Sequence, residues 1–135
     1  MTTSLQDGTM VDKMAHFDLL QEIADSEQKK PWPTGLSSKT LFKKHDLRVV
    51  LISMQNGAHM KEHHADGTIS IHVLKGHLRV SVNNKPHDLP TGTLFTLGAS
   101  IRHDVEARDD SAFLLTISWP SAEELAALKH RGYGS

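Results

Sequence analysis

The chain has 135 residues, 38% of them hydrophobic, which is enough for one compact domain with a core of its own. Its formal net charge of −1 gives no basic surplus, which argues against a nucleic-acid partner. The absence of cysteine excludes disulfides and thiolate sites, and no run approaches the ~20 apolar residues that a membrane span needs.

We expect four segments along the chain. The first residues are polar and carry neither the basic nor the apolar region of a signal peptide, so we expect a cytoplasmic protein without a membrane partner. The segments are a flexible N-terminus (1–15), a helix and connector (16–37), a β-barrel (38–119) and a short C-terminal helix with a tail (120–135).

Apolar residues recur at helical spacing before the barrel and predict a short amphipathic helix near His16 to Ala24. Pro31 and Pro33 disfavour helical geometry in the connector that follows. We therefore expect the connector to lie on the barrel, with Trp32 as an apolar anchor.

From Ser38 onward the hydrophobic period changes to two, which is typical of β-strands. Residues 47–52 are apolar on both faces, so one face can fill a barrel and the other can meet a second sheet or a second subunit. Asn83-Asn84 predicts a hairpin turn, and Ser121 with Glu124 predicts a capped C-terminal helix. Further strands are expected at 69–73, 78–82, 93–97, 101–107 and 112–119, which together indicate an antiparallel sandwich or barrel.

A cluster of glycine and histidine runs through the first half of the predicted barrel. It consists of Gly57, His63, Ala65, Ile69 and Gly76. Its spacing resembles the first motif of the cupin superfamily, in which these positions are Gly, His, His, Glu and Gly. Ala65 therefore stands where the family has its second histidine, and Ile69 stands where it has its glutamate.

A second cluster consists of Gly92, Gly98, Ser100, His103 and Ala107. It resembles the second cupin motif, usually Gly, Pro, Gly, His and Asn, and the short segment between the clusters is similar to that of small bacterial single-domain cupins. The resemblance covers 38–119 and implies an all-β cupin (double-stranded β-helix, jelly-roll or RmlC-like) barrel with short terminal helices. The family is often dimeric and often holds iron, manganese, nickel, copper or zinc through four ligands.

Two of those ligand positions are matched here, by His63 and His103. Strand alternation supports His103, because Ile101, His103 and Val105 share one face and this apolar row should face inward. An imidazole in an apolar interior needs a partner, which a metal, a ligand, a water or the other histidine can supply.

Two imidazoles alone hold a divalent ion weakly, so a metal site needs further ligands. His64 is the first candidate, provided that a loop or bulge turns it toward His63. His72 is the second, although it should face outward unless its strand is bulged. His59 and Glu62 flank the cluster and could reach in from a loop. The hypothetical metal set is therefore His63, His103, His64 and His72.

Three interpretations of the function remain open. The first is a small-molecule-binding barrel of unknown substrate, with a partial histidine site that can hold a divalent transition metal and otherwise no cofactor. The alternative is a metal-dependent enzyme, of dioxygenase or isomerase type, acting on a small apolar or aromatic molecule, without an assigned catalytic residue. The third is a dimeric barrel with no pocket of consequence. In the first two, the expected partners are a small-molecule ligand and a second copy in a homodimer, and the apolar lining is Ile69, Ile71, Val80 and Val105.

Overall fold

The computed structural model describes residues 14–120, apart from the side chains of residues 62 and 63. The described part contains one α-helix, one 3-10 turn and nine strands. Their bounds are α2 Leu19–Glu27, η2 Pro33–Gly35, β1 Leu36–Lys43, β2 Leu47–Met54, β3 His59–His63, β4 Thr68–Lys75, β5 His77–Val82, β6 Lys85–Pro90, β7 Leu94–Leu97, β8 His103–Ala107 and β9 Ser111–Ser118. Within that part, no helix has the length and apolar character required to cross a membrane.

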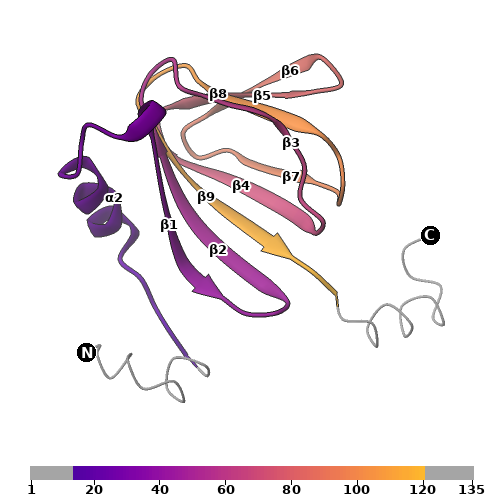
Figure 1. Cartoon of the computed structure of the whole chain (residues 1–135), viewed down its shortest axis with the longest axis horizontal. Coiled ribbons are helices and arrows are strands. Elements are labelled where there is room, and N and C mark those ends of the chain that lie inside the picture. The colour runs from indigo at the N-terminus through magenta and orange to yellow at the C-terminus, as the bar shows by residue number, and fades with distance from the viewer. Residues whose placement is uncertain (1–13, 121–135) are drawn as a thin grey trace.

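The strands form two antiparallel sheets that face one another (Figure 1). One sheet has five strands in the order β1-β2-β9-β4-β7, and the other has four in the order β3-β8-β5-β6. The chain passes from one sheet to the other between β2 and β3, β3 and β4, β4 and β5, β6 and β7, β7 and β8, and β8 and β9. The predicted all-β antiparallel barrel is confirmed.

The core lies between the two sheets and follows from strand alternation. On β4, Ile69, Ile71 and Val73 are buried, whereas the intervening Ser70 and His72 are not. The same alternation fills the interior from the other strands. The buried cluster also contains Val50, Ile52, Met54, Leu78, Val80, Leu89, Val105, Ala107 and Phe113. Each large apolar side chain buried in this way contributes about 1.5–3 kcal/mol.

The outer face of β2 is partly covered by α2, which explains why both of its faces are apolar. Leu51 points away from the interior and packs with Ile23 of α2 and Ala112 of β9. The helix begins at Leu19, later than the predicted His16, because the Asp18 side chain caps it by accepting a hydrogen bond from Gln21 N. It also ends later, at Glu27.

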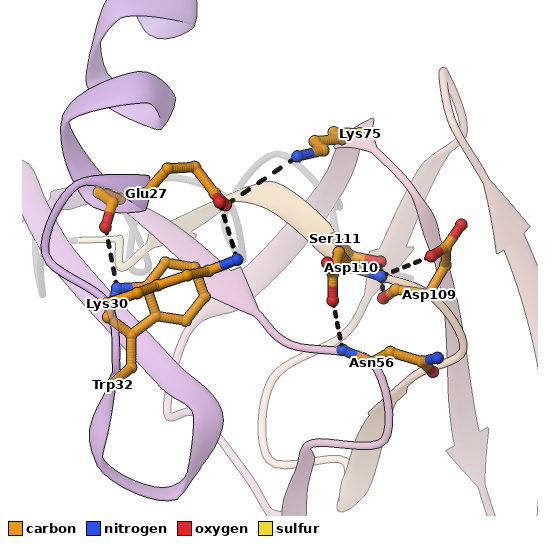
Figure 2. A network of polar contacts seen from close by, with 9 residues as sticks. Glu27, Lys30, Trp32, Asn56, Lys75, Asp109, Asp110 and Ser111 are labelled. Carbon is orange, nitrogen blue, oxygen red and sulfur yellow. Dashed lines mark hydrogen bonds and ion pairs between the residues drawn. The ribbon is translucent and has the colours of Figure 1, made fainter.

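The connector after α2 lies on the barrel as expected. Trp32 is buried, and its Nε1–H donates to the Ser26 carbonyl at 2.9 Å. Lys30 lies over the Trp32 ring, 4.8 Å from its centroid, and pairs with Glu27, which raises the pKa of Lys30 (Figure 2). The second Glu27 oxygen lies 4.0 Å from Lys75 at the end of β4, so the connector is tied to the five-stranded sheet.

One end of the barrel is closed by backbone hydrogen bonds that join its turns to neighbouring strands. Gly57 N donates to the Ala107 carbonyl, and Gly92 N donates to the Val73 carbonyl. The turn before β9 joins the same network, since Asp110 accepts from Asn56 N (Figure 2). We call this the closed end.

The opposite end carries the β3–β4 and β7–β8 connections and the turn between β5 and β6. That turn has Asn83 at φ 53° and Asn84 at φ 63°, as the sequence predicts for a tight hairpin. Most strand boundaries differ from the expected ones by one or two residues. Among them, β1 begins at Leu36, before Ser38, and β8 begins at His103, after Ile101. The predicted flexible N-terminus lies mostly outside the described residues, and the predicted C-terminal helix lies wholly outside them.

Candidate functional site

His103 is a buried polar residue of the interior. It is the first residue of β8 and is 3% exposed. Its Nδ1 lies 3.0 Å from the carbonyl oxygen of Ile101. Because a carbonyl only accepts hydrogen bonds, Nδ1 carries the proton in this contact.

Ile101 contacts His103 through its backbone carbonyl and not through its side chain. We expected Ile101 to share the inner face with His103, but its side chain is 38% exposed. The reason is that β8 starts at His103, so strand alternation does not extend back to Ile101. The residue instead fixes the imidazole through its backbone.

His103 lies at the end of the barrel where the apolar lining is incompletely buried. Val82 on β5 is its direct register partner and is half-buried. Facing them, Leu97 and Ile117 both pair with Ile69 on the five-stranded sheet and are also half-buried, as is Ala65 in the β3–β4 connection. We call this the open end, defined by Ala65, Val82, Leu97 and Ile117.

The predicted lining residues are deeper than the open end. Ile69, Ile71, Val80 and Val105 are all between 0% and 3% exposed and belong to the packed core. The pair of Val80 and Val105 lies one step further into the barrel than the pair of Val82 and His103. They therefore lie beneath His103 in the core, while Val82, Leu97 and Ile117 are half-buried and pack against that core at the open end. The period-two pattern that predicted the four lining residues also includes Val82, Leu97 and Ile117. The pattern does not show, however, that these three residues are only half-buried.

A β-bulge in β3 sets which residue lies opposite His103. Met60 pairs with Val105, and His63 pairs with His103, so β3 contains one residue more than β8 between these pairs. In a regular ladder, the backbone of Glu62 would oppose His103. The bulge therefore brings the backbones of the two predicted histidines together.

The further candidate ligands do not join His103. His72 is exposed and lies between the buried Ile71 and Val73, so it is on the outer face of the sheet, away from the interior. His64 is exposed in the connection after β3. His59 is part of β3, not of a loop, and its Nε2 lies 3.6 Å from Asp104 on the outer surface.

The donor set described for residues 14–120, leaving out the side chains of 62 and 63, does not complete a metal site by itself. Among these residues, no group of three or more histidine, aspartate or glutamate side chains is placed to hold a metal ion. Ala65 and Ile69, which stand at two of the family's ligand positions, offer no donor atoms, and Ile69 is packed in the core.

Comparison with known proteins identifies the family. Residues 50–119, more than half of the chain, match the family model described as the cupin domain. The chain belongs to the cupin family. None of the curated proteins compared matches the chain.

Solved structures with the same fold include several cupins. A conserved protein of unknown function from Streptococcus pyogenes is 22% identical with a TM-score of 0.62, over 66% of this chain and 78% of that one. An RmlC-like cupin from Desulfovibrio desulfuricans is 20% identical with a TM-score of 0.64, over 78% and 96%. A cupin 2 conserved barrel domain protein from Leptotrichia buccalis is 28% identical with a TM-score of 0.63, over 70% of this chain and 46% of that one. The predicted membership of the cupin superfamily is confirmed.

Proposed function

We propose that this cupin binds a small, largely apolar molecule at the open end of its barrel, with His103 as the polar contact. The observation that carries the proposal is a buried imidazole, fixed through Nδ1 by the Ile101 carbonyl and surrounded by half-buried apolar side chains. Small-molecule sites have this composition, a mostly apolar wall with few placed polar atoms. The neutral tautomer set by Ile101 accepts through Nε2, so the ligand should carry a hydroxyl or N–H donor.

The alternative, a metal-dependent enzyme, has one supporting observation. A backbone carbonyl that receives Nδ1–H is also the arrangement that orients metal-binding histidines. The described side chains do not complete a ligand set, however, so we derive no chemical step through a metal. Binding of a small molecule is the function that the described residues support best.

The first test is a titration of the full chain with phenol, a small aromatic hydroxyl donor. Binding is monitored through the backbone and side-chain NMR signals. Phenol should give saturable shifts at Val82, Leu97 and Ile117, and His103→Ala should weaken binding by up to about tenfold, because it removes one hydrogen bond. His72→Ala is the matched control, since His72 is on the outer face, and it should bind phenol as tightly as the native chain.

Metal content decides between the two functions in the same samples. Elemental mass spectrometry on tag-free protein should find no stoichiometric metal, before or after incubation with iron, manganese, nickel, copper or zinc salts. Near-stoichiometric metal that is lost in His103→Ala and kept in His72→Ala would contradict the proposal and support the enzyme. Absence of any phenol-induced shift at the open end would also contradict it.

A further inference from the structure

A second feature at the same end of the barrel has a different chemistry. A cavity of about 670 Å³ opens beside the β1–β2 hairpin and the end of β9. We call it the hairpin cavity, defined by its lining residues Lys43, Lys44, His45, Arg48 and Trp119. It has no part in the cupin motifs.

The register of the strands places the hairpin cavity on the inner side of the five-stranded sheet. Arg48 pairs with Ile117, whose side chain packs against the core, so Arg48 shares that face. Lys43 pairs with Arg48 across the hairpin and lies on the same side. Trp119 is two residues beyond Ile117, and its backbone N–H donates to the Asp46 carbonyl, which holds the hairpin against the end of β9.

The lining concentrates positive charge around an aromatic ring. Lys43, Lys44 and Arg48 are cationic, His45 adds a further charge when protonated, and no carboxylate lines the cavity among residues 14–120. The guanidinium carbon of Arg48 lies 5.4 Å from the centroid of the Trp119 ring. Cations gathered in one concavity repel one another and raise the local concentration of anions.

Arg48 also has an unexplained donor. Its Nε atom is buried and makes no hydrogen bond to any residue in the described part of the chain. Buried donors are nearly always paired, so an isolated one calls for a partner. An arginine guanidinium presents its N–H groups as a planar fork that fits the two oxygens of a carboxylate or phosphate.

We infer that the hairpin cavity is a binding site for the carboxylate or phosphate group of a small organic anion. Arg48 and the two lysines would hold the oxyanion, and the Trp119 ring would contact the apolar body. The site is at the open end, because Ser118 pairs with Leu47 on one side and with Thr68 on the other. It does not depend on the proposed contact with His103.

The test is a titration of the native full-length chain with benzoate, monitored through the Arg48 Nε–H and Trp119 Nε1–H signals in NMR spectra. Benzoate should shift both signals in a saturable way, while benzamide, its uncharged analogue of similar shape, should not. Inorganic phosphate should compete with benzoate for the site. Added sodium chloride should weaken the binding of both anions, as expected for a solvent-accessible charged site.

Variants assign the binding to individual residues. Arg48→Gln should weaken benzoate binding about tenfold or more, since it removes a charge-assisted hydrogen bond, and its own spectrum shows whether the fold is intact. Arg79→Gln is the matched control, because Arg79 is a similarly half-exposed arginine that pairs with Asp88 on the other sheet at 3.2 Å. It should bind benzoate normally. Lys43→Gln together with Lys44→Gln should weaken binding while leaving the Arg48 guanidinium unchanged.

Three results would overturn the inference: equal shifts with benzamide and benzoate, undiminished benzoate binding in Arg48→Gln, or no saturable shift at all. The two proposals fail separately. His103→Ala should retain benzoate binding while losing phenol affinity, and Arg48→Gln should retain phenol binding while losing benzoate affinity.

Discussion

At the scale of the residue, the orientation of His103 is fixed by its own chain. The Ile101 carbonyl, two residues before it, receives the Nδ1 proton, so the contact does not depend on a side chain from another strand. Substitution at position 101 should therefore leave the imidazole oriented.

At Gly76, the addition of a single methyl group should lower the free energy of unfolding substantially. Gly76 has φ +85°, and a Cβ there would lie 2.3 Å from the Asp110 carbonyl oxygen and 2.3 Å from Ser111 Oγ. Gly76→Ala should lower the free energy of unfolding by about 2–4 kcal/mol, since a left-handed backbone and a clash with backbone atoms add together. Urea denaturation measures the change.

Gly92 provides the control for this substitution. It has φ +91°, but a Cβ there would meet nothing within 4 Å. Gly92→Ala should therefore cost about 1 kcal/mol, from the backbone conformation alone. Equal costs at the two positions would mean that the close approach at Gly76 is relieved by movement of the turn.

At the scale of the element, α2 shows what local sequence can and cannot predict. The apolar spacing predicted a helix in this region, and Ile23 is buried as that pattern requires, whereas Leu20 of the same pattern is 80% exposed. The boundaries were wrong by three residues at each end, because the Asp18 cap is a local polar contact and the hydrophobic period does not report it. The start of the helix could have been found from the Asp-x-x-Gln spacing alone.

The Asp18 cap makes a prediction for α2. Asp18→Ala should destabilise the protein by about 1 kcal/mol, because Gln21 N loses its acceptor, whereas Asp18→Asn should cost less. Thermal unfolding of the two variants checks this. Since α2 covers Leu51 and Ala112, amide exchange on the outer face of β2 should also increase in Asp18→Ala if the helix frays. Equal stabilities for the two variants would contradict the role of the carboxylate.

At the scale of the whole molecule, the barrel has two unlike ends. The closed end is held by backbone bonds between turns, and Leu78 near it is 0% exposed. The open end has half-buried Leu97. Leu78→Ala should therefore cost about 2–5 kcal/mol, and Leu97→Ala should cost clearly less, because part of the Leu97 side chain is in contact with water in the folded state. Chemical denaturation of this matched pair measures the difference.

Most of this architecture was predictable from the sequence, and little of the site was. Period-two alternation and two spaced glycine–histidine clusters were sufficient for the fold, because both depend on short-range spacing. The position of His72 followed from alternation as well. The bulge in β3 and the hairpin cavity did not, since each arises from the pairing of distant segments, as when Arg48 meets Trp119. The homodimer expected from the apolar outer face stays a prediction.

The extra residue in β3 makes the partner of His103 depend on the length of the strand. Because the residue facing His103 in register is set by a bulge, it can be exchanged by changing the length of the strand, without any substitution. Deleting Lys61 would leave one residue between Met60 and His63, as there is between Val105 and His103. A regular ladder would then keep the backbone of His63 opposite His103, whereas a strand that retained its bulge would bring the backbone of His64 there instead. Insertions and deletions in β3 therefore act on the position opposite His103 through the register of the backbone.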